Sequence, residues 1–264
     1  MALPYHSFIS WDIGAITIQS YGLMVALAFL AGLFLAVKEA KKRKLDEEII
    51  YDLAFYILIG GIVGARIANV IQEWGYYSGN LAGIFKIWQG GLNFNGGFIL
   101  ASLLAYIYLK RKRLNFWLYM DTFAPSIAIG HAIGRIGCIL GDGGHVGKLT
   151  NMPWGFLVNG EARHVTAWYE LFFLIALFIL LTAIKDKKKI KGKTGSLFLI
   201  YLSAYSVGRS VIDIFRADPT YLGLTSMQWT AIPFFFISVY LLNKRYRFLN
   251  KFAIKGVKKW QLKK

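Results

Sequence analysis

The chain has little charge, one cysteine and few prolines for its length. Only 17% of its 264 residues are charged, against roughly 25% in ordinary soluble domains, and 56% are hydrophobic. With a mean hydropathy of +0.46, the composition excludes an ordinary soluble domain and predicts an integral membrane protein. The single cysteine, Cys138, excludes an internal disulfide and a cysteine-based metal cage, and we expect neither a metal nor a cofactor.

Acidic residues are also scarce, with 14 Asp and Glu against 31 Lys and Arg, which gives a net charge of +17. Most of the basic residues lie in four clusters: Lys38–Lys44, Lys110–Arg113, Lys185–Lys193 and Lys244–Lys264. The clusters flank apolar segments of roughly 17 to 23 residues, the length that crosses about 30 Å of hydrocarbon. We therefore expect the charge to face anionic lipid headgroups of the inner leaflet, and we expect no nucleic acid as a partner.

The apolar segments predict an all-α membrane protein with seven transmembrane helices. They lie at about residues 18–37, 49–72, 94–109, 116–136, 166–184, 195–215 and 226–243. Basic clusters follow the first, third, fifth and seventh segments, which places the N-terminus outside and the C-terminus in the cytoplasm. We expect a membrane domain over residues 1–243 and a basic amphipathic tail over 244–264 that lies on the inner leaflet.

Two predicted connections on the outer side are long, at about residues 73–93 and 137–165. The second is rich in glycine and polar residues. Long connections in compact proteins usually carry function, so the outer face is the expected working face.

Seven basic residues lie outside the clusters, and three of them, Arg66, Arg135 and Arg209, stand within or at the end of predicted membrane helices. Such a residue costs roughly 2.5 kcal/mol or more and normally faces a partner or a water-filled cavity. Each arginine alone is equally well explained as a structural tie, and Arg209 can pair with Asp213 one turn further on. Because guanidinium binds phosphate through two parallel hydrogen bonds, the three together predict a site for an anionic lipid headgroup.

Six short motifs, spread over nearly the whole chain, resemble those of bacterial prolipoprotein diacylglyceryl transferases in order and spacing. They are Ser20-Tyr21-Gly22-Leu23, Gly64-Ala65-Arg66, Phe85 to Leu92, Gly134-Arg135-Ile136-Gly137, Arg163-His164 with Tyr169-Glu170, and Arg209 through Arg216. The resemblance implies a seven-span enzyme of the bacterial inner membrane with its active face toward the periplasm or exterior. It would move the diacylglyceryl group of phosphatidylglycerol onto the lipobox cysteine thiol of a prolipoprotein and release glycerol phosphate.

The resemblance also implies roles for individual residues. Arg135 and Arg209 match the family's headgroup and phosphate arginines, Tyr21 matches a tyrosine near the reacting lipid, and Asp213 takes the place of a glutamate. Arg66 and His164 are further candidates for headgroup binding, although His164 is also suited to orienting the helix that follows it. These roles fit the chemistry, because a departing phosphate requires fixed positive charge.

The sequence departs from the family where a base is expected. The family's His-Gly-Gly reads Asn95-Gly96-Gly97 here, and asparagine cannot accept a proton at physiological pH. The Asn95 amide can still bind a phosphate oxygen, and the N–H groups of Gly96 and Gly97 at a helix start can face an anion.

A replacement acid–base pair is available in the outer segment, where His145 lies near Asp142, although an ordinary solvated loop would have the same residues. His131 lies one turn before Arg135 on the same helix face, where it either bridges helices or contacts the headgroup. The alternative function is a catalytically altered relative that binds or presents anionic phospholipid, or that transfers lipid to a different acceptor.

Overall fold

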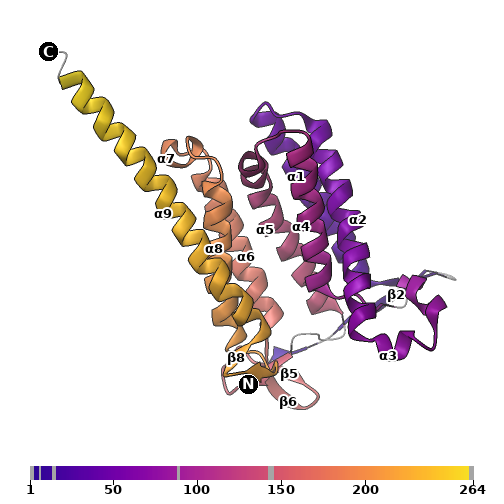
Figure 1. Ribbon diagram of the computed structural model, residues 1–264. Coiled ribbons are helices and arrows are strands. Elements are labelled where there is room, and N and C mark those ends of the chain that lie inside the picture. The colour runs from indigo at the N-terminus through magenta and orange to yellow at the C-terminus, as the bar shows by residue number, and fades with distance from the viewer. Residues whose placement is uncertain (1–2, 6, 14–15, 88–89, 142–145, 262–264) are drawn as a thin grey trace. The chain divides into compact units, whose positions relative to one another are not determined.

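The computed structural model describes residues 3–5, 7–13, 16–87, 90–141 and 146–261 (Figure 1). The chain divides into two compact units, the first formed by residues 1–35 and 120–264 and the second by residues 36–119. Two helices, α1 (Ser20–Lys42) and α5 (Phe116–Leu140), run from one unit into the other. The first unit further contains α6 (Thr166–Ile184), α7 (Lys188–Lys191), α8 (Ser196–Asp213) and α9 (Ser226–Gln261). The second contains α2 (Glu47–Gln72), α3 (Trp74–Tyr77), the 3-10 helix η1 (Leu81–Phe85) and α4 (Phe94–Arg111).

Each of the seven apolar segments predicted from the sequence falls on a helix, namely α1, α2, α4, α5, α6, α8 and α9. Within the described residues, α1, α2, α5 and α6 are long and apolar enough to cross a membrane. A membrane protein built from helices is therefore confirmed, whereas the number of spans and the sidedness stay predictions. Helix α9 continues to Gln261, so the predicted tail begins as an extension of the last helix.

Short strands that the sequence pattern did not predict lie before α1 and in the connections between helices. One sheet has the order β1 (Leu3–Pro4), β5 (Phe156–Val158), β6 (Glu161–Val165) and β4 (Val146–Leu149). Two hairpins, β2 (Ser10–Ile13) with β3 (Ile16–Gln19) and β7 (Thr220–Tyr221) with β8 (Leu224–Thr225), complete the strands of the described residues.

Strand β4 joins this sheet to the chain just after α8. Gly147 pairs with Arg216 as an isolated antiparallel bridge, and the N–H of Lys148 donates to the carbonyl of Phe215 over 2.9 Å. A side chain at Gly147 would begin 2.2 Å from that same carbonyl oxygen, so only glycine allows the two backbones this close. The sheet is thereby fixed to the end of the helix that carries Arg209.

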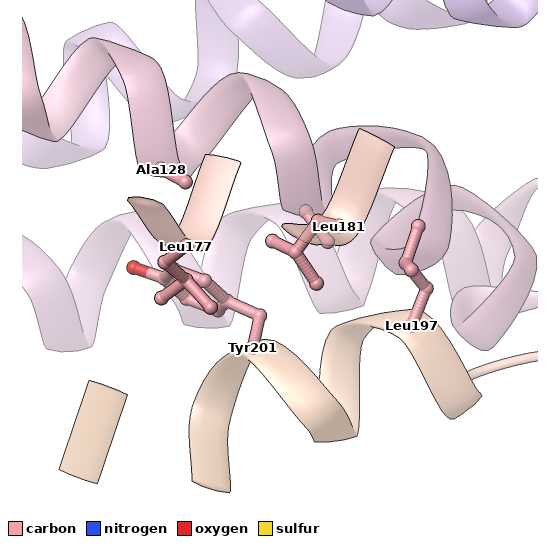
Figure 2. Close-up of a cluster of buried hydrophobic side chains, with 6 residues drawn as sticks. Ala128, Leu177, Leu181, Leu197 and Tyr201 are labelled. Carbon is pink, nitrogen blue, oxygen red and sulfur yellow. The ribbon is translucent and has the colours of Figure 1, made fainter. Parts of the chain in front are cut away.

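The core of the first unit lies between α5, α6 and α8. Ala124 and Ala128 of α5 pack against Leu177 and Leu181 of α6 and against Leu197 and Tyr201 of α8 (Figure 2). Small residues on α5 bring the helices close, which matters in lipid because packing replaces the hydrophobic effect as the force between helices.

The carboxylate of Asp121 in α5 strengthens the same contact at the start of α8. Its two oxygens accept hydrogen bonds from the backbone N–H groups of Gly195 (2.5 Å) and Phe198 (2.9 Å). A negative group at a helix N-terminus satisfies unpaired donors and complements the helix dipole.

Helices α2 and α4 pack side by side in the second unit, with glycine facing glycine. A Cβ at Gly64 would lie 2.4 Å from the carbonyl oxygen of Gly96, and a Cβ at Gly97 would lie 2.7 Å from that of Gly61. A side chain larger than hydrogen fits neither at Gly64 nor at Gly97, and such small residues are typical of close helix pairs in membranes.

Candidate functional site

The centre of the candidate site is the buried carboxylate of Glu170 in α6, whose side chain is 1% exposed. Its Oε1 accepts hydrogen bonds from Arg135 Nη2 (2.9 Å) and from the hydroxyl of Tyr205 (3.1 Å). Its Oε2 accepts from Arg209 Nη1 (3.1 Å). Glu170 thus binds two of the three arginines that the sequence singled out, Arg135 from α5 and Arg209 from α8, with a different oxygen for each.

His131 also belongs to this cluster. Its Nε2 lies 3.2 Å from Arg135 Nη2 and 3.4 Å from Glu170 Oε1, and its ring contacts that of Tyr205. Because Glu170 lies on α6 and Tyr205 on α8, His131 of α5 bridges helices next to the ion pair of Arg135 and Glu170.

The ion pairs continue along α8. Arg209 Nη2 lies 2.8 Å from Asp213 Oδ1, which confirms the pair expected from their spacing of four residues. Asp213 Oδ2 accepts a hydrogen bond from Thr225 Oγ1 (2.6 Å), and Arg216 Nε lies 3.7 Å from Asp213 Oδ1 and 2.6 Å from Asp218 Oδ2. Basic and acidic groups therefore alternate from Arg135 to Asp218.

Arg135 differs from its partners because part of its guanidinium has no strong acceptor. Among the described residues, its Nε is buried and has no hydrogen-bond partner. Its Nη1 lies 3.7 Å from the sulfur of Cys138, and a thiol sulfur is a weak acceptor. A buried N–H without a partner is costly, so an anion at this position would complete the hydrogen bonding of Arg135.

Tyr21 lies at the start of α1 in the same unit and is 54% exposed. It packs against Gly137 of α5, where an added Cβ would begin 3.4 Å from the Tyr21 ring. Tyr21 therefore contacts α5 at a residue two positions after Arg135, and its side chain is partly exposed.

Arg66 is held differently. In the second unit, its Nε donates to Ile84 O (2.8 Å), its Nη1 to Gly90 O (2.7 Å) and Gly91 O (2.9 Å), and its Nη2 to Gly83 O (2.5 Å). The guanidinium also lies over the Tyr77 ring, 5.1 Å from its centre. Every nitrogen of this buried side chain has a carbonyl partner, so the geometry assigns Arg66 to holding the segment that contains η1.

The start of α4 is capped from within. The Asn93 side chain accepts hydrogen bonds from the N–H groups of Asn95 (2.9 Å) and Gly96 (3.4 Å), and the N–H of Gly97 donates to Asn93 O (3.2 Å). The N–H groups of Gly96 and Gly97 were expected to face an anion, and in the structure they are already paired. Asn95 is exposed.

His164, at the end of β6, is buried and hydrogen-bonded through Nδ1 to the hydroxyl of Tyr169 (2.7 Å). Its ring also meets Phe215 edge to face. Burial lowers the pKa of His164 below its ordinary value. These contacts favour the orienting role over headgroup binding, because the side chain joins β6, α6 and the end of α8.

Two of the residues proposed from the sequence, Asp142 and His145, lie outside the described residues. Two others, Glu170 and Tyr205, are central in the structure and were not selected from the sequence. The available signals for Glu170 were its place in the Tyr169-Glu170 motif and its position as an acidic residue in the first turns of an apolar helix. Within the described ranges, no group of three or more His, Cys, Asp and Glu residues is arranged to hold a metal ion.

Comparison with known proteins shows which family the chain is similar to. The sequence model described as prolipoprotein diacylglyceryl transferase matches residues 8–243. The chain is 37% identical over 225 residues to the phosphatidylglycerol–prolipoprotein diacylglyceryl transferase of Nostoc sp., covering 80% of this chain and 79% of the relative. The enzyme of the same name from Finegoldia magna is 37% identical over 216 residues, covering 81% and 86%. That from Listeria innocua is 38% identical over 219 residues, covering 78% of each chain.

Proposed function

The chain belongs to the prolipoprotein diacylglyceryl transferase family, and we propose that it transfers the diacylglyceryl group of phosphatidylglycerol to the lipobox cysteine thiol of prolipoproteins. The observation that carries this proposal is the buried cluster in which Glu170 joins Arg135 and Arg209 and leaves Arg135 Nε unpaired. A fixed, partly unsatisfied guanidinium is suited to a phosphate that gains charge as it departs.

In the proposed reaction the cysteine sulfur, as a thiolate, attacks the glyceryl carbon that carries the phosphate ester. The carbon–sulfur bond forms as the carbon–oxygen bond breaks, and the electron pair of the broken bond goes to the phosphate oxygen. Glycerol phosphate leaves with that charge, which Arg135 and Arg209 stabilise. Tyr21, half-exposed beside Gly137, borders the lipid, and Asp213 holds Arg209 from the opposite side of its guanidinium.

The thiol proton requires an acceptor, because a free cysteine has a pKa near 8.5. We assign that role to His145 with Asp142, since Asn95 cannot take a proton. Asn95, with Gly96 and Gly97 beside it, remains a candidate for lipid contact through its exposed amide. His164 and Arg66 have structural roles, each within its own unit.

We further propose that the protein spans the bacterial inner membrane seven times, with the N-terminus and active face toward the periplasm or exterior. The basic residues from 244 onward would then lie at the cytoplasmic side, against anionic lipids of the inner leaflet. The basic clusters after the first, third, fifth and seventh helices support this orientation.

The test is lipid transfer by the purified protein in vesicles of phosphatidylglycerol, followed by mass spectrometry of a synthetic lipobox peptide. A mass increase equal to a diacylglyceryl group is expected on the cysteine peptide and not on a matched peptide with serine in its place. Arg135→Ala should abolish transfer, whereas Arg66→Lys should leave partial activity. Absence of transfer to any thiol peptide by folded protein would refute the proposal.

Because Asn95 cannot accept a proton, it favours a second candidate function, in which the protein binds or presents anionic phospholipid without transferring it. In that case phosphatidylglycerol should co-purify with the protein and be lost in Arg135→Ala. The peptide should stay unmodified, and Asn95→His would be the variant in which to look for gained transfer.

A further inference from the structure

Glu170 of α6 contacts two arginines that lie on two other helices. Arg135 lies on α5 and Arg209 on α8, 35 and 39 residues from Glu170 along the chain. One carboxylate oxygen binds each arginine, at 2.9 Å and 3.1 Å, so the carboxylate sets the separation of the two guanidinium groups.

The contacts of Glu170 also set how each guanidinium is turned. Arg135 gives Nη2 to Glu170 and keeps Nε and Nη1 away from strong acceptors. Arg209 gives Nη1 to Glu170 and Nη2 to Asp213, so it is held from two sides. Without Glu170, Arg135 would lose its one strong acceptor and rotate toward any anion that arrives.

We propose that Glu170 is a positioning residue of the transfer reaction, which fixes the spacing and orientation of Arg135 and Arg209 without contacting the substrate. The inference rests on the proposed function. Mispositioning of reacting groups by about 1 Å can cost on the order of 10²-fold in rate, so a carboxylate that fixes two arginines acts strongly on turnover.

Stability alone does not explain a carboxylate at this place. Removing an ion from water is expensive, and replacement of a buried ionic cluster by packed apolar residues is often neutral or stabilising. Tyr205 adds a further hydrogen bond to Oε1, so the carboxylate is held in one orientation. The cost of burying the carboxylate and its fixed orientation both favour a role in positioning the two arginines.

The negative charge of Glu170 also competes with the phosphate for the same two cations. Neutralising Glu170 should therefore tighten the binding of a phosphate while it slows the reaction, because the arginines become more attractive and less well placed. A side chain with a purely structural role would not produce this opposite pair of effects.

The experiment compares Glu170→Gln and Glu170→Asp with the unaltered protein in phosphatidylglycerol nanodiscs. Turnover is measured as kcat and KM for the lipobox peptide, and glycerol phosphate is titrated as the binding probe. For Glu170→Gln we expect kcat to fall by about tenfold or more and glycerol phosphate to bind several-fold tighter. Glu170→Asp keeps the charge but is one methylene shorter, so it should recover part of kcat with unchanged probe affinity.

Asp121→Asn is the matched control, since Asp121 is another buried carboxylate of the same unit that caps α8. It should lose stability without tighter probe binding. If Glu170→Gln behaves like Asp121→Asn, or if Glu170→Asp and Tyr205→Phe both keep full kcat, the positioning role is wrong. Tyr205→Phe, which removes only the hydroxyl that holds Oε1, provides the test should Glu170→Gln fail to fold.

Failure of the proposed function would look different. If the unaltered protein modifies no peptide, the function is refuted, and the probe titration then decides the inference alone. Tighter binding of glycerol phosphate by Glu170→Gln would still support control of the arginines by Glu170, and unchanged binding would refute it.

Discussion

Arg66 donates from Nη1 to the carbonyl oxygen of Gly91 over 2.9 Å, and a side chain at Gly91 would begin 2.8 Å from the same nitrogen. The backbone of Gly91 has φ of +70°, in the left-handed region that disfavours side chains. Gly90 has a similar φ of +86° but open space where its Cβ would lie. A comparison of substitutions at Gly90 and Gly91 therefore separates the effect of backbone strain from the effect of crowding the Arg66 guanidinium.

Gly91→Ala should destabilise the protein more than Gly90→Ala does. Strain of about 1–2 kcal/mol is expected at either position, and Gly91→Ala also displaces the Arg66 guanidinium from its carbonyl partners. Thermal unfolding in detergent, followed by near-UV circular dichroism, measures the difference. Equal losses in the two variants would show that Arg66 adjusts without cost.

The crossing of α2 and α4 makes a second prediction. Gly64→Ala places a Cβ 2.4 Å from the carbonyl oxygen of Gly96, which forces the helices apart, whereas Gly61→Ala on the same helix meets nothing within 4 Å. We expect Gly64→Ala to lower stability by about 1–3 kcal/mol, as in other overpacked contacts, and Gly61→Ala to be nearly neutral. A similar midpoint of unfolding for both variants would contradict this helix contact.

Local spacing explains what the sequence predicted well. Arg209 and Asp213 are four residues apart on one helix, so their ion pair follows from helix geometry alone. The seven apolar segments likewise predicted helices correctly, because the length and composition that a membrane helix needs are contained in each segment.

Contacts between distant parts of the chain explain what the sequence did not predict. Glu170 was visible as part of the Tyr169-Glu170 motif and as an acidic residue in an apolar helix, but its partners come from α5 and α8. The sheet was missed because β1 pairs with β5 across most of the chain, Leu3 opposite Phe156. The role expected for Arg66 rested on its charge, whereas its acceptors are backbone carbonyls, which carry no sequence signal.

The third prediction concerns Asp213, which takes the place of a glutamate in the family. The Asp213 side chain is fully buried between Arg209 and Thr225, with contacts of 2.8 Å and 2.6 Å. Asp213→Glu adds a methylene to this space and should cost about 1–3 kcal/mol. Thr225→Ser keeps the hydroxyl that contacts Asp213 on a smaller side chain, so the double variant should recover part of the loss. Chemical denaturation of the two single variants and the double variant measures the coupling, and simple additivity would show that the two side chains do not share this space.

The last prediction concerns the effect of pH on stability through His164, which lies outside the predicted membrane segments. Burial lowers the pKa of His164 in the folded protein below its ordinary value of 6.5, so the folded state holds this ring neutral. Below pH 6.5 the unfolded chain binds a proton here that the folded chain does not. The stabilising contribution is therefore fully present above about pH 6.5 and is lost as the pH falls toward the lower folded pKa.

His164→Asn removes the titrating ring, so the difference in unfolding free energy between the unaltered protein and this variant should shrink as the pH falls from 7.5 toward 5. Tyr169→Phe is the control, because it deletes the 2.7 Å hydrogen bond and leaves the buried imidazole in place. Denaturation at several pH values should give a pH dependence that persists in Tyr169→Phe and weakens in His164→Asn. A difference that stays constant across this range would mean that His164 is equally easy to protonate in the folded and unfolded chains.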